Sequence, residues 1–178
     1  MIIQLCGLSG SGKTTIASKT KELLENAGIT IEIIDGDEYR KELCADLGFS
    51  REDRNKNIRR LAFVAGKLSE HSILSIICAI NPYENVRQEV VAKYKHVKTV
   101  FIDCDMLTLI QRDTKGFYKK SQLPDGDPDK MNNLTGVNDP FEPPENADLV
   151  IHTDLEQADE SADKLYQFIL QHLDTFTS

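Results

Sequence analysis

The sequence predicts an α/β protein with three layers, in which a mostly parallel five-stranded sheet lies between helices and carries an irregular lid. Two observations predict the layers: short apolar runs alternate with segments of helical periodicity, and a glycine-rich loop joins the first strand to the first helix. A third observation predicts the lid, because periodicity disappears over residues 114–144. With 178 residues, 40% of them hydrophobic, a single domain over residues 1–178 is the simplest organisation.

Each element follows from a local pattern. Gly28 is a helix stop before a β-rich run, and Ser50 with Asp53 resembles a capping box that opens a long helix. The last helix is amphipathic. The predicted elements are, in order, strand 1–6, helix 15–26, strand 29–34, helix 39–47, helix 51–70, strand 73–80, helix 84–94, strand 97–103, helix 107–112, a short strand around 150–151 and helix 157–173.

The glycine-rich loop matches a phosphate-binding loop over its full length. Its glycines let consecutive backbone N–H groups surround phosphate oxygens, and the following helix adds its positive N-terminal end. Lys13 can then reach the β and γ phosphates, and Thr14 can bind Mg²⁺. The alternative is a glycine-rich turn that precedes a lysine by chance. The position of the loop between a strand and a helix favours the phosphate-binding loop over that alternative. We therefore predict a P-loop NTPase fold that binds a nucleoside triphosphate, which we expect to be ATP. The residues predicted to bind it are Gly7, Leu8, Ser9, Gly10, Ser11, Gly12, Lys13, Thr14 and Thr15.

Composition excludes several other classes. The chain has 21 Lys and Arg against 29 Asp and Glu, a formal charge of −8, which argues against a general nucleic-acid or anionic-membrane surface. Its four cysteines lack Cys-x-x-Cys spacing, so neither a zinc site nor a disulfide framework is indicated. No apolar run approaches a bilayer span, and the N-terminus is typical of a strand rather than a cleavable signal. We expect a soluble, cytoplasmic protein.

Two carboxylates follow the second predicted strand. Asp35 and Asp37 lie where ligands bind in an open α/β sheet, at the carboxyl edge. One can hold Mg²⁺ through a water molecule while the other takes the proton of an acceptor hydroxyl. The alternative is that they form only a polar turn. Which of the two is the base stays open at this point.

Basic side chains gather at the start of the long helix and in the lid. Arg54, Arg59 and Arg60 could face a ligand, or they could form a solvated face paired with acidic neighbours. Asn57 would share the face of Arg54. Three lid lysines could neutralise a transferring phosphoryl group or could simply be solvated: Lys115, Lys119 and Lys120.

Several motifs occur together and in order along nearly the whole chain, and in combination the sequence resembles the adenylyl-sulfate kinase family. They are the phosphate loop; Asp35-Gly36-Asp37 with Arg40; the run from Leu47 to Arg60; Asn81-Pro82-Tyr83; Arg112 to Tyr118; and Leu134 to Pro144. The combination is far more specific than the phosphate loop, which many unrelated proteins share.

The resemblance implies transfer of phosphate from ATP to the ribose 3′-hydroxyl of adenosine 5′-phosphosulfate, with Mg²⁺. It places Asp37 at that hydroxyl with Asp35 close by, Phe49 on the acceptor base and Arg112 near ATP. The forked guanidinium groups suit the phosphosulfate of the acceptor. Around the acceptor it places Arg40, Arg54, Asn57, Ile80, Asn81, Lys115, Asn133 and Leu134. Relatives are commonly homodimers, which is analogy only.

Two departures from the family pattern affect the acceptor pocket. Leu134, which follows an unusually long segment at 122–133, stands where typical members have a phenylalanine stacked on the acceptor base. Asn81 stands where relatives often have serine, so a phosphoserine there is excluded and transfer must be direct. A related branch phosphorylates other nucleotides, such as cytidine diphosphoramidate for capsule modification. The acceptor base therefore stays open between adenine and cytosine.

A regulatory nucleotide switch is the alternative from another class. The sequence has no Asp-x-x-Gly after the third predicted strand, which a GTPase switch would require. The paired aspartates and the basic lid instead favour transfer to a small acceptor.

Overall fold

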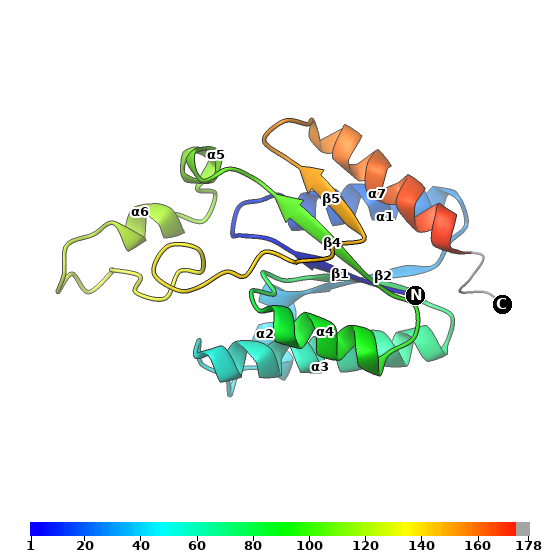
Figure 1. Ribbon diagram of the computed structural model, residues 1–178, viewed down its shortest axis with the longest axis horizontal. Helices are drawn as coiled ribbons and strands as arrows, with labels where there is room; N and C mark the ends of the chain where they lie inside the picture. Colours follow the sequence, from blue (N-terminus) through cyan, green and yellow to red (C-terminus); the bar gives the residue numbers. More distant parts are fainter. Residues whose placement is uncertain (174–178) are drawn as a thin grey trace.

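The computed structural model, which describes residues 1–173, has one five-stranded sheet in the order β2-β3-β1-β4-β5 (Figure 1). All four strand pairings are parallel, as predicted for a three-layer α/β fold. The strands are β1 (Ile2–Cys6), β2 (Ile31–Asp35), β3 (Leu74–Cys78), β4 (Val97–Asp103) and β5 (Leu149–His152). The helices are α1 (Lys13–Asn26), α2 (Gly36–Leu43), α3 (Arg51–Glu70), α4 (Glu84–Lys93), α5 (Met106–Arg112), α6 (Phe117–Ser121) and α7 (Ala158–Leu173).

The two faces of the sheet are covered by different helices. Every residue of β1 is buried, and its successive side chains point to opposite faces. Ile3 and Leu5 pack with α1 and α7, whereas Ile2 packs with α3 and α4. Figure 1 shows α1 and α7 on one side of the strands and α2, α3 and α4 on the other. A strand buried on both faces explains why the sequence shows an apolar run there that is interrupted only by Gln4.

Local capping corrects one predicted boundary and confirms another. The helix predicted at 39–47 instead begins at Gly36 and ends at Leu43, because the Asp35 carboxylate accepts hydrogen bonds from the backbone N–H groups of Asp37 and Glu38. The capping box is confirmed, since the Ser50 hydroxyl accepts from the N–H of Asp53 at the start of α3.

The lid segment, residues 114–144, extends from the carboxyl edge of the sheet and returns beside β4 (Figure 1). It contains the five-residue helix α6, which was not predicted. A small apolar core of its own, formed by Cys104, Leu109, Tyr118 and Leu134, ties it to α5 and the end of β4. The single-domain prediction ran to 178, and its last five positions, 174–178, lie outside the described residues.

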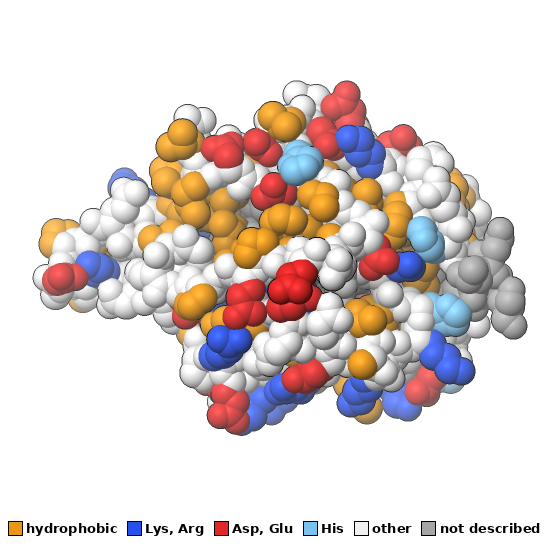
Figure 2. Space-filling view, in the orientation of Figure 1, with side chains coloured by type: hydrophobic (Ala, Val, Ile, Leu, Met, Phe, Trp, Pro, Cys, Tyr) orange, Lys and Arg blue, Asp and Glu red, His pale blue; other side chains and the backbone are white. Residues whose placement is uncertain are grey.

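The surface mixes charges of both signs. Figure 2 shows acidic and basic side chains interspersed on one face, with apolar side chains gathered over α5, β4 and β5. Leu107 and Val150 are among the exposed apolar residues of this region. Within residues 1–173, no helix is both long and apolar enough to cross a bilayer.

Candidate active site

One cavity of about 290 Å³ lies at the carboxyl edge of the sheet, where ligands bind in this class of fold. Its walls come from five parts of the chain that are distant in sequence: the phosphate loop, the end of β2, the start of α3, the end of β3 with the loop that follows it, and the lid segment. The lining residues include Lys13, Thr14, Asp35, Asp37, Arg40, Phe49, Arg54, Asn57, Ile80, Asn81, Lys115 and Phe117. The cavity therefore brings together most of the predicted site residues.

The backbone of the phosphate loop requires glycine at its ends. A Cβ on Gly7 would lie 2.4 Å from the carbonyl oxygen of Ile102, a contact that backbone atoms cannot relieve. Gly12 has a φ of 96° at the N-cap of α1, in the left-handed region that favours glycine. Both glycines therefore shape a loop that leads directly into the positive end of a helix.

Lys13 lies folded onto this loop. Its Nζ donates hydrogen bonds to the carbonyl oxygens of Gly7 and Leu8, at 2.8 and 2.7 Å. Burial lowers the pKa of Lys13 to about 8, because desolvation penalises the charged form. The ammonium group is thus held at the loop by neutral carbonyl acceptors. Charged phosphate oxygens are stronger acceptors and could replace them.

The two predicted carboxylates have different environments. Asp35 is engaged through both oxygens: Oδ1 caps α2, and Oδ2 accepts a hydrogen bond of 3.0 Å from the Thr14 hydroxyl. Asp37 is exposed and forms a close ion pair with Lys115 of the lid segment. The structure therefore joins Asp35 to the phosphate loop and Asp37 to the lid.

The far end of the cavity combines cationic groups with an aromatic ring. Phe49 is 52% exposed, and the Arg40 guanidinium lies over its ring, 4.4 Å from the ring centroid. Arg40 is held by the carbonyl oxygens of Leu47 and Gly48, and Arg54 Nε donates to the Phe49 carbonyl at 3.0 Å. A half-exposed ring in contact with two guanidinium groups suits a flat, anionic ligand such as a nucleotide.

The floor of the cavity is polar and buried. Asn81 is 1% exposed, and its Nδ2 donates to Gln4 Oε1 at 3.2 Å in the middle of β1. Arg87 donates to the Asn81 carbonyl at 2.7 Å, which fixes the backbone at a positive φ of 48°. Asn57 is also buried, and neither asparagine has a hydrogen-bond partner for Oδ1 among the described residues. Two buried acceptors therefore remain next to the cavity.

Several residues that were candidates do not reach this cavity. Arg59 and Arg60 form exposed ion pairs with Glu89 and Asp46. Of the two roles considered for these arginines, the structure therefore shows the solvated face and not contact with a ligand in the cavity. Leu134 is only 3% exposed inside the lid core, so it offers no open face to a base. The lining also omits Asn133, Lys119 and Lys120.

Arg112 lies behind the phosphate loop. Its guanidinium donates to the hydroxyl and the carbonyl oxygen of Thr153, at 3.1 and 2.5 Å. The same hydroxyl donates to the Ser11 carbonyl at 2.9 Å. Arg112 therefore braces the loop from the ends of β4 and β5 instead of lining the cavity.

Tyr118 is a site residue that sequence reasoning missed. Its hydroxyl donates to the Ser9 carbonyl at 2.8 Å, and burial raises its pKa to about 12. The bond attaches the lid segment directly to the phosphate loop. Its sequence signal is its place at the end of the Arg112–Tyr118 motif, which by itself does not indicate a bond to the phosphate loop.

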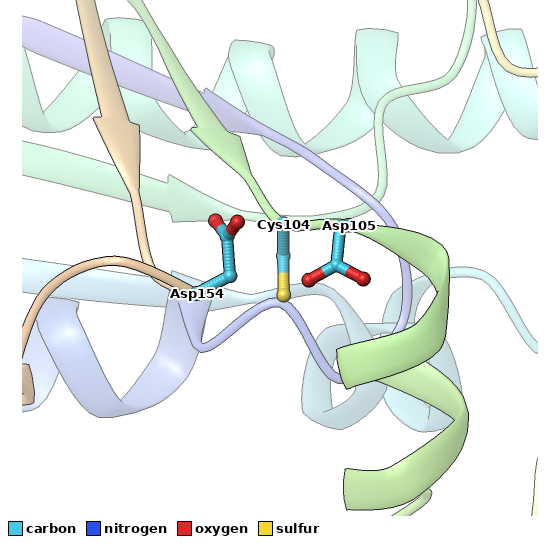
Figure 3. A group of neighbouring side chains, drawn as sticks. All are labelled: Cys104, Asp105 and Asp154. Atoms are coloured by element: carbon cyan, nitrogen blue, oxygen red, sulfur yellow. The ribbon is translucent and has the colours of Figure 1, made fainter.

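One acidic cluster next to the site has a structural explanation. Cys104, Asp105 and Asp154 lie within 4.8 Å of one another at the ends of β4 and β5 (Figure 3). Asp105 caps α5 by accepting from Leu107 and Thr108, and Arg112 donates to the Cys104 sulfur at 3.5 Å. A capping role accounts for Asp105, and the neighbouring guanidinium contacts Cys104.

Comparisons with known proteins agree with this geometry. A family model described as adenylylsulphate kinase matches residues 1–152. The chain is 41% identical to the adenylyl-sulfate kinase of Rippkaea orientalis, over 93% of this chain and 88% of the relative, and 42% identical to that of Chloroflexus aurantiacus, over 93% and 86%. The Mycobacterium tuberculosis APS kinase in complex with AMPPNP and APS has a TM-score of 0.85 at 34% identity, covering 97% of this chain and 96% of that one. A shikimate kinase from Aquifex aeolicus, 17% identical with a TM-score of 0.51, shares the fold alone.

Proposed function

The chain belongs to the adenylyl-sulfate kinase family, and from this membership we propose that it transfers the γ-phosphate of ATP to the ribose 3′-hydroxyl of adenosine 5′-phosphosulfate. The observation that carries the proposal is that one cavity joins a phosphate loop to an aromatic and cationic pocket, with two carboxylates between them. A kinase for an anionic nucleotide needs these parts in that order.

The donor half consists of the phosphate loop and Lys13. Lys13 exchanges the carbonyl oxygens of Gly7 and Leu8 for the phosphates of ATP, where its charge opposes the charge that develops during transfer. Ser9, Gly10 and the loop N–H groups contribute fixed dipoles that need no rearrangement. Arg112 holds the loop through Thr153 and so acts at a distance from the phosphates.

Thr14 and Asp35 fit a magnesium ion. Their two oxygens lie 3.0 Å apart next to the phosphate loop, and Mg²⁺ prefers hydroxyl, carboxylate and water oxygens. In this proposal Thr14 binds the ion directly and Asp35 holds it through a water molecule. An ion held there would supply positive charge that offsets the negative charge of the ATP phosphates.

Asp37 is the better candidate for the base. Asp35 already uses both oxygens for Thr14 and the α2 cap, whereas the only side-chain partner of Asp37 within residues 1–173 is Lys115. When Lys115 turns to the anionic substrate, the Asp37 carboxylate becomes free to accept the proton of the 3′-hydroxyl. Lys115 then adds its charge to the transferring group.

The acceptor half binds the base and the phosphosulfate. Phe49 stacks on the base, and Arg40 and Arg54 are placed beside it for the phosphosulfate charge. Asn57, Ile80 and Asn81 complete the floor of the pocket. Because an asparagine amide cannot form a phosphoester, transfer proceeds directly from ATP to the acceptor.

Product analysis tests this function. The enzyme should form ADP and 3′-phosphoadenosine 5′-phosphosulfate in equal amounts, measured by ³¹P NMR, and the 3′-deoxy acceptor should give neither. Asp37→Asn should lower kcat about 10² to 10⁴-fold and leave ATP binding intact. Equal ADP formation with the 3′-deoxy acceptor would contradict the assignment of the reacting hydroxyl.

A further inference from the structure

Arg54 contacts more of the site than any sequence pattern indicates. Its Nη2 donates to the Asn133 carbonyl at 2.6 Å and lies 3.0 Å from Asp139 Oδ2, while Nε donates to the Phe49 carbonyl at 3.0 Å. One guanidinium thus joins α3, the loop that carries the exposed aromatic ring, and the far end of the lid segment. Asp139 is its only acidic partner among residues 1–173, and the sequence assigned Asp139 itself no catalytic or binding role.

Asp139 is rigidly held. Its carbonyl accepts from Gly136 N–H at 2.7 Å, and its own N–H donates to the Leu134 carbonyl at 3.2 Å. The backbone therefore forms a tight turn at 134–139, anchored through Leu134 in the lid core. Such a turn places the carboxylate at a fixed point relative to the lid.

The Arg54–Asp139 pair is largely removed from water. The two side chains are 10% and 23% exposed, and Asp139 Oδ2 has no hydrogen-bond partner among the described residues, so its contact with Arg54 is one of charge. A buried guanidinium facing only neutral carbonyl oxygens is unfavourable, because nothing offsets the loss of hydration. In the free protein, Asp139 supplies that missing negative charge.

We propose that Asp139 is a positioning residue: in the free enzyme it holds Arg54 and the closed lid segment in place until the anion of the acceptor provides the compensating charge. This inference rests on the proposed function, in which Arg54 binds the phosphosulfate. Arg54 Nη1 has no partner among residues 1–173 and remains available for that anion. Acceptor binding thus begins from a placed guanidinium, which reduces the cost of ordering the site.

A second ion pair provides the matched control. Glu142, three residues after Asp139, lies 2.9 Å from Arg51, three residues before Arg54. Both pairs fasten the returning part of the lid segment to α3, but only one includes a residue that lines the cavity. Asp139→Asn and Glu142→Gln both replace a carboxylate by an amide, and the amide oxygen of glutamine can still accept from the Glu84 N–H that Glu142 Oε2 binds at 2.8 Å. A larger effect of Asp139→Asn on the acceptor would therefore indicate a role exerted through Arg54, and the Arg54→Ala background tests that role directly.

Kinetics give the first test. If the closed lid is populated about one tenth of the time in Asp139→Asn, the Michaelis constant for adenosine 5′-phosphosulfate should rise about tenfold. The Michaelis constant for ATP should stay within about twofold of the wild-type value. Glu142→Gln should change the acceptor constant less than threefold. In an Arg54→Ala background, Asp139→Asn should add little, since the effect passes through Arg54. Equal rises in both variants, or a lower constant in Asp139→Asn, would overturn the proposal.

Limited proteolysis gives a second test that does not depend on catalysis. Trypsin should cut after the exposed Lys119 or Lys120 faster in free Asp139→Asn than in the wild type or Glu142→Gln, and adenosine 5′-phosphosulfate should restore protection. Asp139→Glu, which keeps the charge, should stay protected, and thermal unfolding shows whether each variant is folded. Unchanged cleavage in a folded Asp139→Asn refutes the inference, whereas a wild type that does not phosphorylate the acceptor refutes the proposed function instead.

Discussion

Lys13 shows how the environment of one residue sets a testable pH dependence. Its pKa is lowered to about 8 by burial, and the ammonium form is the one that binds phosphate. The value of kcat/KM for ATP, which reports the free enzyme, should therefore fall as the pH rises through about 8. Steady-state kinetics between pH 6 and about 10 measure this directly.

Lys13→Arg is the control, because arginine stays charged throughout that range. Its activity should be lower, since the fork does not fit the loop, but its kcat/KM should lack the decline near pH 8. If kcat/KM of the wild type stays level to about pH 10, the pKa assigned to Lys13 is wrong. If Lys13→Ala is nevertheless inactive, Lys13 still has its role in binding phosphate.

Phe117 lines the cavity, whereas Leu134, the position that the sequence suggested for the acceptor base, does not. Phe49 and Phe117 are the only aromatic residues among those that line the cavity, and Leu134 is buried beneath the lid surface. An aromatic ring on a base contributes about 1–3 kcal/mol. Phe117→Leu should therefore raise the Michaelis constant for the acceptor about five- to tenfold and leave that for ATP nearly unchanged.

Leu134→Phe is the matched comparison. Adding volume to a filled core costs about 1–3 kcal/mol, so this variant should melt earlier or cleave faster in the lid without binding adenosine 5′-phosphosulfate more tightly. If Leu134→Phe binds the acceptor more tightly and Phe117→Leu has no effect, position 134 and not Phe117 contacts the acceptor base. Assays with a cytidine acceptor in both variants also test base selection.

The element that couples the two halves of the site is the lid segment with α6. Tyr118 fastens it to the phosphate loop through the Ser9 carbonyl. Tyr118→Phe removes this bond, worth about 1 kcal/mol, and should raise the Michaelis constant for ATP several-fold. Tyr39→Phe, on α2, should have no such effect. Equal ATP constants for Tyr118→Phe and the wild type would show that the bond does not position the loop.

Elements with a strong local signal could be predicted from the sequence, and contacts between distant segments could not. The phosphate loop, the Ser50 cap and the order of strands and helices all follow from neighbouring residues. The site was predicted to bring Asp35, Asp37 and Arg54 to one edge, and the topology does so. The partner of Arg54 was not predicted, because Asp139 lies far along the chain, after an aperiodic lid.

In the whole molecule, the apolar cores that stabilise the sheet and the cavity that contains the candidate site lie in different places. Two apolar cores, one on each face, hold β1 rigidly, and the cavity opens only at the carboxyl edge, where the strands end. A protein of net charge −8 thus confines its cationic binding groups to one cavity. Donor and acceptor anions would share that cavity, which places the two reacting groups close together.

In the proposed reaction, phosphate passes directly between two nucleotides in this cavity, without a covalent intermediate on the protein. The most direct measurement uses ATP made chiral at the γ-phosphorus with oxygen isotopes and determines the configuration of the 3′-phosphate in the product. A single in-line transfer predicts inversion. Retention would require two transfers and a phosphorylated residue, and would contradict the account.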